Sequence, residues 1–221
     1  MTIVMLSDTH NRHTKLKIPK CDVLIHCGDY SSMGYEREVR SFYRWLDEQP
    51  AKYLISVQGN HELGWEKNPN LMTDIAKQEC PNVILLNDSS TLIDGVKFYG
   101  TPVTPYFFNW AYNRGETPED AFKYGVPYIK PHFDAIPNDI NVLITHGPPF
   151  GVLDTVEGRE GEPLGSKTLL EAVKRVKPDI HVFGHIHSSN GEAHINGTSF
   201  YNVSICDEKY LATRTPRIIN L

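Results

Sequence analysis

The sequence predicts an α/β domain built from alternating strands and helices, and three observations indicate it. Short runs rich in β-branched and aromatic residues recur along the 221 residues. Stretches with helical spacing separate several of these runs in the first half of the chain, which is typical of layered α/β domains. Asp, His or Asn residues follow directly after five of the runs, at the strand ends where open α/β sheets bind their ligands.

The predicted strands are short β-rich runs that alternate with turn residues. In chain order they cover residues 2–6, 22–26, 53–57, 83–86, 96–100, 141–145, 179–183, 198–204 and 216–221. The last third of the chain is rich in strands without helices between them. We therefore expect these last strands to lie at the edges of sheets.

Two segments show the apolar spacing of amphipathic helices, residues 35–48 and 169–176. Pro50 and Pro178 lie just beyond their ends, where proline cannot continue a helix. Ser166 is a suitable N-cap for the second helix, because its hydroxyl can accept a hydrogen bond from the first turn.

Two stretches, 101–117 and 147–165, match neither pattern. They are rich in aromatic residues or in Gly and Pro, and they are long for connecting loops. Long loops without regular structure often carry function, so we expect them to cover a site as lids.

The composition is that of a globular protein without a basic face. Hydrophobic residues make up 40% and charged residues 22% of the chain, and the formal charge of −5 is spread evenly. Surfaces that bind extended nucleic acids are usually basic, so the charge argues against a surface for long nucleic acids. An apolar run that approaches the about 18 residues of a membrane span is absent from the sequence, so we expect no membrane partner.

The four cysteines are expected to be free thiols. Cys21 and Cys27 flank the predicted strand 22–26, whose extended rise separates them by roughly 20 Å. A disulfide tolerates only about 7 Å between the two Cα atoms. Free thiols are typical of a reducing compartment, and the apolar run 2–6 is too short for a signal peptide. The sequence therefore predicts a cytoplasmic protein.

The polar residues after five predicted strands form the most informative pattern. The blocks read SDTH, CGDY, QGNHE, HGPP and GHIH. They carry Asp8, His10, Asp29, Asn60, His61, Glu62, His146, His185 and His187. Each block alone is also explained by turn chemistry, but its repetition at five equivalent strand ends favours one shared site.

This set of side chains suits metal ions. Histidine and carboxylate groups are good ligands for Zn, Fe and Mn, and an asparagine oxygen suits a hard cation. The set is larger than one tetrahedral ion needs, whereas two ions about 3.5–4 Å apart, sharing a carboxylate, would use most of it. Two such ions can clamp a phosphoryl group and supply a hydroxide for in-line attack. His185 and His187 stand two residues apart, and on an extended segment they would point to the same side.

The order SDTH, CGDY, GNHE, THG and GHIH resembles the signature blocks of the calcineurin-like metallophosphoesterase superfamily, across about residues 7 to 187. The runs GDYSSMG, GNHEL, TPYFFNWAYN, THGPPFGVLD and TSFYNVSICD are similar to a subgroup, the metallophosphoesterase-domain-containing proteins of vertebrate brain and their microbial and viral relatives. The resemblance implies a single domain over residues 1–221. It also implies a four-layer α/β/β/α sandwich with metals at the mouth between the sheets.

The resemblance further implies a role for each residue of the blocks. The first metal ion would be held by Asp8, His10, Asp29 and His187. The second would be held by Asp29, Asn60, His146 and His185, with Asp29 as the bridge. Mn²⁺ is the expected metal, and Fe, Zn, Co and Ni stay open as alternatives. His61 is implied to contact the phosphate and to protonate the leaving group, and Glu62 is expected to support the loop without binding metal. Some vertebrate members carry glycine at the position of His185, so its presence here predicts a complete second site.

Expectations for the surrounding residues follow from the pattern alone. Trp110 and its aromatic neighbours could form a wall that stacks against a nucleobase or an aryl group, although core packing would also explain them. Arg12, Tyr30 and Trp65 are expected to flank the mouth. His13 is expected at the surface, and His26 and His181, inside predicted strands, are expected to serve packing.

The leading functional hypothesis is a dinuclear-metal phosphodiesterase that hydrolyses small phosphodiesters, including cyclic nucleotides. A metal-bound hydroxide would attack phosphorus, with catalytic roles for His61 and Asp29 and substrate contacts from Asn60, His61 and Trp110. A phosphomonoesterase or a nuclease on the same core is the alternative, and a non-catalytic binding scaffold is a third reading. The oligomeric state stays open.

Overall fold

The computed structural model describes residues 1–158 and 161–221, and two mixed sheets stack within it. The first sheet has the order β13-β1-β2-β3-β4, with strands Arg217–Asn220, Thr2–Leu6, Cys21–His26, Ala51–Ser56 and Ile84–Leu85. The second has the order β11-β12-β10-β9-β6-β5, with strands Gly191–Ile195, Thr198–Asn202, Ile180–Phe183, Val142–Thr145, Val96–Thr101 and Ser89–Ile93. A small pair joins β7 (Thr104–Pro105) to β8 (Asn113–Arg114).

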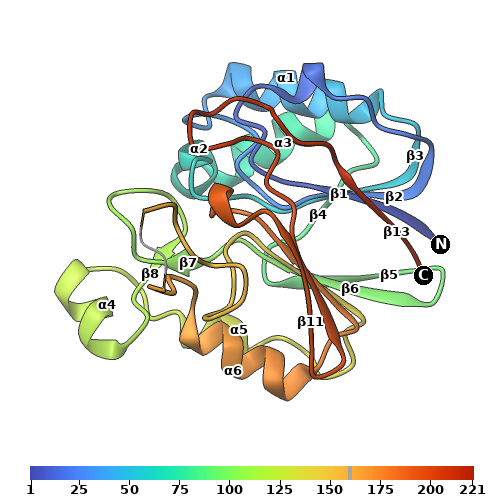
Figure 1. Cartoon of the computed structure of the whole chain (residues 1–221). Helices are drawn as coiled ribbons and strands as arrows, with labels where there is room; N and C mark the ends of the chain where they lie inside the picture. The colour runs from blue at the N-terminus through green and yellow to red at the C-terminus, as the bar shows by residue number, and fades with distance from the viewer. Residues whose placement is uncertain (159–160) are drawn as a thin grey trace.

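Helices cover the outer faces of both sheets, as Figure 1 shows. The helices of the described residues are α1 (Glu36–Asp47), α2 (Leu63–Lys67), α3 (Pro69–Glu79), α4 (Pro118–Tyr124), α5 (Lys130–Asp134) and α6 (Lys167–Val176). Helix α4 lies to one side of the sheets and buries none of its residues. Helices α1 and α3 pack beside the first sheet and α5 and α6 beside the second. The α/β fold class predicted from the sequence is therefore confirmed, and the described layers follow the order α/β/β/α.

The layers are separated by three apolar clusters, and β1 shows why. Val4 and Leu6 point into the cluster under α1, whereas Ile3 and Met5 point into the cluster between the two sheets. Side chains alternate between the faces of a strand, so a strand covered on both sides must be apolar throughout. This explains why TIVML reads as a continuous apolar run.

Parallel pairing of β1, β2 and β3, and of β9, β10 and β12, brings the carboxyl ends of these strands together. The expectation of strand-rich edges is also correct, because β13 and β11 are antiparallel edge strands. Strand β11, strand β5 and helices α2 to α5 were not anticipated from the sequence, because their apolar residues are too few or too irregularly spaced to mark them.

Three expectations about individual residues are wrong. His13 is buried, because the 3₁₀ turn His13–Lys15 directs its ring against Phe42 and Trp45, with centroids 5.6 and 5.3 Å away. Tyr30 and Trp65 do not flank the mouth. Both are buried in the core under α1, where the indole N–H of Trp65 donates to the Tyr30 hydroxyl.

All four cysteines are free and buried. Among the helices of the described residues, none is long and apolar enough to cross a membrane.

His181 on β10 is fully buried, and its protonation allows a test of how stability depends on pH. Its Nε2 donates to the Thr145 hydroxyl at 2.9 Å, because that hydroxyl itself donates to the Gly147 carbonyl. Its Nδ1 has no hydrogen-bond partner in the described part of the chain. Burial lowers the pKa of His181 from 6.5 to about 3, so the folded protein keeps the ring neutral.

We expect the free energy of unfolding to decrease as the pH falls below 6.5, the ordinary pKa of histidine. Below this pH, His181 is protonated in the unfolded chain but stays neutral in the folded protein. This difference lowers the free energy of unfolding by about 2 kcal/mol at pH 5. Urea unfolding at pH 7 and pH 5, with a chelator present throughout, measures the difference. His181→Gln should reduce the difference by about this amount, whereas His194→Gln, at an exposed position, should leave it unchanged. Equal pH dependence in wild type and His181→Gln would contradict the expectation.

Candidate metal centre

The polar blocks predicted from the sequence meet at the carboxyl ends of the parallel strands. Asp8 follows β1, Asp29 follows β2 and His146 follows β9. The two sheets are joined at this edge, because the Ser7 N–H donates to the Val203 carbonyl at 3.0 Å. Residues from opposite sheets therefore face each other across one site.

Two glycines allow the loops to approach this closely. A Cβ added to Gly59 would lie 2.3 Å from Asp29 Oδ1, and one added to Gly184 would lie 2.0 Å from Asp8 Oδ2. Any side chain at either position would collide with a carboxylate. The glycines of QGNHE and GHIH thus serve the close packing of the acidic residues.

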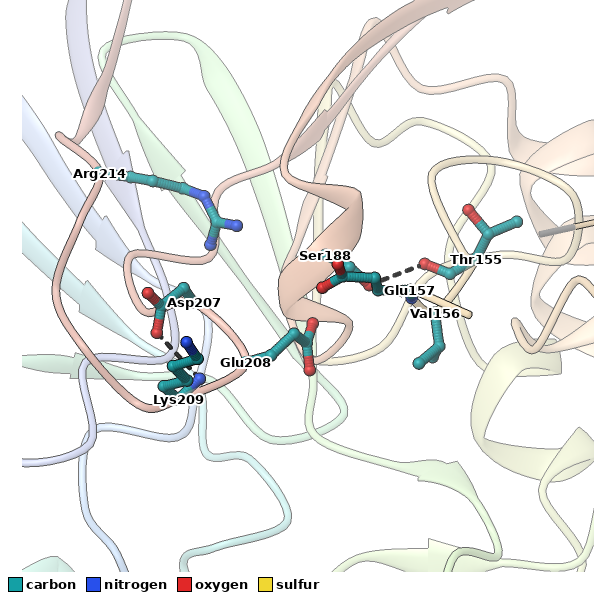
Figure 2. A pocket seen from close by; sticks show the side chains of 8 residues that line it. All are labelled: Thr155, Val156, Glu157, Ser188, Asp207, Glu208, Lys209 and Arg214. Carbon is teal, nitrogen blue, oxygen red and sulfur yellow. Dashed lines mark hydrogen bonds between the residues drawn. The ribbon is translucent and has the colours of Figure 1, made fainter. Parts of the chain in front are cut away.

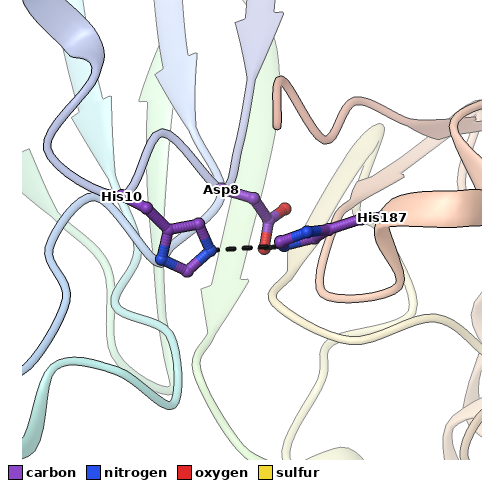
Figure 3. Close-up of side chains that lie close together, drawn as sticks. All are labelled: Asp8, His10 and His187. Carbon is purple, nitrogen blue, oxygen red and sulfur yellow. Dashed lines mark hydrogen bonds and ion pairs between the residues drawn. The ribbon is translucent and has the colours of Figure 1, made fainter. Parts of the chain in front are cut away.

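Asp8, His10 and His187 form the first group, shown in Figure 3. The Nε2 atoms of the two histidines face each other at 3.2 Å, and His187 Nε2 lies 3.4 Å from Asp8 Oδ1. The Nδ1 atoms point away and bind the carbonyls of Ser31 (3.1 Å) and Asp207 (3.0 Å). Since a carbonyl only accepts, each Nδ1 carries a proton and each Nε2 can offer its lone pair to a cation.

Asp29, His146 and His185 form the second group. His146 Nε2 lies 2.9 Å from Asn60 Oδ1 and 3.3 Å from Asp29 Oδ2, while its Nδ1 donates to the Cys27 carbonyl at 2.9 Å. The rings of His146 and His185 are 5.0 Å apart. His146 repeats the arrangement of the first group, with its Nδ1 anchored by a backbone carbonyl and its Nε2 facing inward.

Asp29 lies between the two groups. Its Oδ2 is 3.9 Å from Nε2 of His10 and 3.9 Å from Nε2 of His61, besides its contact with His146. Its Oδ1 accepts the backbone N–H of His61 at 2.9 Å. One carboxylate thus faces histidines from both groups, which is the geometry required of a bridging ligand.

The charges of the site match a cation. Burial alone would raise the pKa of Asp8, but hydrogen bonding and charge from His187 outweigh it and hold this pKa below its usual range. Burial opposes a charge on His187 and His146, yet Asp8 and Asp29 raise the pKa of these two imidazoles to about 9. Two protons therefore occupy the lone pairs that divalent ions would use, and metal binding would displace them.

Burial decides the protonation of the other two histidines. The pKa of His10 and that of His185 are both lowered to about 4. Both rings are neutral at pH 7, which is the form that binds metal. The donor set and its burial fit divalent ions.

Glu62 organises the loops beneath these groups. Its carboxylate accepts the backbone N–H of Asp29 at 2.8 Å and that of Gly59 at 2.7 Å, and it accepts both the N–H and the hydroxyl of Ser31. The side chain is fully buried and ties the loop after β2 to the loop after β3. This agrees with the expectation that Glu62 supports the loop.

His185 and His187 do not share an extended segment, so the reason given for their spacing is wrong. His185 has a left-handed backbone, with φ 69°, and a 3₁₀ turn begins at His187. The rings consequently diverge, one toward His146 and the other toward Asp8. The backbone N–H of His185 also donates to the Asp8 carboxylate at 3.0 Å.

A cavity of about 410 Å³ opens over the two groups. The two long stretches without a strand or helix pattern both line this cavity. Residues 101–117 contribute Tyr106, Phe107 and Trp110. Residues 147–165 contribute Gly147, Pro148, Val156, Leu164 and Gly165. Residues 159 and 160 of the second stretch lie outside the described residues. The expected aromatic wall is present, although Phe108 is 68% exposed.

Trp110 stacks on the ring of His61, with centroids 4.1 Å apart and planes inclined by 28°. His61 Nδ1 donates to the Ser32 carbonyl at 2.7 Å, which leaves its Nε2 toward Asp29. Since one face of Trp110 is covered by His61, the indole fixes this imidazole as well as lining the cavity.

Sequence reasoning missed the contribution of the C-terminal segment. The Ser204 hydroxyl donates to Asp8 Oδ2 at 2.8 Å, although 196 residues separate them. The Asp207 carbonyl holds His187, and Tyr210 lines the cavity. The run TSFYNVSICD pointed to this region only through its resemblance, and the chain pattern itself carries no signal for these contacts.

Comparison with known proteins finds a matching family model and several relatives. The family model for calcineurin-like phosphoesterases matches residues 1–189. Metallophosphoesterase domain-containing protein 1 of Homo sapiens is 34% identical over 242 residues, covering 99% of this chain and 70% of that protein. A UPF0046 protein of Caenorhabditis elegans is 35% identical over 219 residues, with 94% and 71% covered.

A similar fold occurs in the phosphopantetheinyl hydrolase PptH of Mycobacterium tuberculosis. Its crystal structure has a TM-score of 0.64 and 17% sequence identity, covering 99% of this chain and 95% of that one.

Proposed function

Because the chain belongs to the calcineurin-like phosphoesterase family and groups with the metallophosphoesterase-domain-containing proteins, we propose that it is a metal-dependent phosphodiesterase. Its substrates in this proposal are small phosphodiesters, cyclic nucleotides included. The observation that carries the proposal is the two ligand groups with Asp29 between them, at the floor of the cavity. His61 stands beside them and lies close to both Asp29 and His10.

Two divalent ions, with Mn²⁺ proposed first, fit this donor set. Asp8, His10, Asp29 and His187 would hold one ion, and Asp29, Asn60, His146 and His185 would hold the other. Such ions supply charge that stabilises the phosphoryl oxygens and lowers the pKa of bound water.

His61 is proposed to donate the proton to the leaving oxygen. Its Nδ1–H is committed to the Ser32 carbonyl, so its Nε2 is the atom that faces the reacting centre. Trp110 holds the ring from one side. A fixed imidazole of this kind suits general acid catalysis, since proton transfer requires hydrogen-bond reach in a defined direction.

The cavity favours a small substrate. Its volume of about 410 Å³ lies within the range of small-molecule sites, roughly 300–1,000 Å³. Asn60, His61 and Trp110 are proposed to contact the substrate, the first two at the phosphate and the third at the ester group. Apolar and aromatic walls above a polar floor suit a diester that carries an organic substituent on each side of the phosphate.

Chelation should abolish hydrolysis of bis(p-nitrophenyl) phosphate, and added Mn²⁺ should restore it, because the negative phosphate requires the cations to approach two carboxylates. Release of p-nitrophenol, measured beside elemental analysis, tests this. Purified, metal-loaded protein that is inert toward phosphodiesters would contradict the proposal. Parallel assays on p-nitrophenyl phosphate, 2′,3′- and 3′,5′-cyclic nucleotides and single-stranded DNA separate diesterase from monoesterase and nuclease activity.

A further inference from the structure

A short hairpin, residues 206–212, lies over the first ligand group and beyond residues 1–189 that match the family model. Its ends pair through Cys206 and Ala212. Inside it, the Asp207 carboxylate accepts the backbone N–H groups of Lys209 (2.9 Å) and Leu211 (3.0 Å). These bonds hold the turn in one conformation, so the side chains at its tip have fixed positions.

The Asp207 carbonyl connects this hairpin to the candidate metal centre. It accepts the Nδ1–H of His187 at 3.0 Å and the backbone N–H of Tyr210 at 2.9 Å. The atom that orients a proposed metal ligand therefore also closes the turn that presents Tyr210. Tyr210 itself has a left-handed backbone, with φ 57°, which directs its side chain back over the site.

The ring of Tyr210 contacts three imidazoles of the site. Its centroid lies 4.7 Å from that of His10, 5.4 Å from that of His187 and 6.2 Å from that of His61. The side chain is 45% exposed and lines the cavity over Asp29. A group that extends in this cavity toward His10 and His187 will touch the Tyr210 ring.

We propose that Tyr210 is a specificity-determining residue that binds the ester group which stays on phosphorus when the diester is cleaved. This inference rests on the proposed phosphodiesterase function. The leaving oxygen must lie at His61 Nε2, whose flank is occupied by Trp110. Tyr210 is closer to His10 and His187 than to His61, so it stands on the side of the retained group.

A cavity on the other side of the hairpin supports placing the retained ester group at Tyr210. A second cavity, of about 450 Å³, lies between the hairpin and residues 155–157 (Figure 2). Val156 and Glu208 line both cavities, so the second cavity adjoins the first on this side. A retained ester group that packs on the Tyr210 ring therefore lies on the side of the first cavity that adjoins the second.

The test compares a diester with a monoester that lacks a retained ester group. Tyr210→Ala should raise KM for bis(p-nitrophenyl) phosphate by about tenfold, the loss expected for one aromatic contact, with kcat changed less. KM for p-nitrophenyl phosphate and competitive inhibition by inorganic phosphate should stay unchanged. Tyr210→Phe, which keeps the ring, should restore the wild-type KM, and Phe122→Ala, a ring removed from a 92% exposed position on α4, should match wild type.

Metal content must be equal in Tyr210→Ala and wild type, because His187 is held by the Asp207 backbone and not by the tyrosine side chain. Equal increases in KM for both esters, or weaker inhibition by phosphate, would overturn the inference, since Tyr210 would then act on the phosphoryl group. An unchanged KM for the diester would overturn it as well. A wild-type protein inactive on both esters would refute the phosphodiesterase proposal itself, which is a separate outcome.

Discussion

Replacement of His61 by alanine is expected to lower kcat for an alkyl phosphodiester by about 10²–10⁴-fold, the usual contribution of a general acid. Both metal ions should remain bound. The imidazole is anchored outside the ligand groups by the Ser32 carbonyl and by Trp110, so its removal leaves the backbones of Asp29 and Asn60 in place. Pre-steady-state or steady-state kinetics beside elemental analysis measures both quantities.

The choice of leaving group sharpens this result. A p-nitrophenolate leaves with little help from an acid, whereas an alkoxide needs protonation, so the loss in His61→Ala should be larger for an alkyl ester. His194→Ala, at an exposed histidine on β11, serves as the matched control and should behave as wild type. Loss of metal together with the His61 ring would show that His61 is a ligand and would refute its role as an acid.

Replacement of Asp29 by asparagine is expected to release both ions and to lower activity by on the order of 10³-fold or more, since the bridging charge is removed. The substitution is isosteric, and the amide oxygen can still accept the His61 N–H that Oδ1 accepts at 2.9 Å. The effect therefore reports charge rather than loop geometry. Metal titration by calorimetry, at fixed pH, gives the stoichiometry and affinity.

Asp139→Asn is the control for Asp29→Asn, because Asp139 is an exposed partner of Lys97. It should bind two ions with wild-type affinity. If Asp29→Asn also bound two ions tightly, Asp29 would not be the bridge, and the two groups would have to act as separate sites. His185→Gly, by contrast, should weaken only the second ion.

Local pattern was sufficient for the parts of the fold that neighbouring residues determine. The apolar run of β1, the helical spacing of α1 and the serine cap of α6 each appear within a dozen residues, and each is found where it was predicted. The Ser166 hydroxyl accepts the Leu169 N–H at 3.0 Å, as its position implied. Some short strands and the conformation of the stretch 101–117 were not predicted, because they depend on packing against distant residues.

The candidate site divides in the same way. Asp8, Asp29 and His146 could be identified because each stands at the end of a strand, and parallel strands bring their ends to one edge. What the sequence determined by itself is therefore the set of ligand-type residues and the edge on which they meet.

Tertiary structure alone decided how those residues are oriented and what surrounds them. The left-handed turn at His185, the carbonyl that holds His187 and the ring of Tyr210 depend on contacts between segments far apart in the chain. Burial of His13 was likewise decided by its packing on α1. A hydrogen bond to a backbone carbonyl cannot be predicted from the residue types, since every residue carries that group. The direction of each imidazole is therefore a property of the fold and not of the motif.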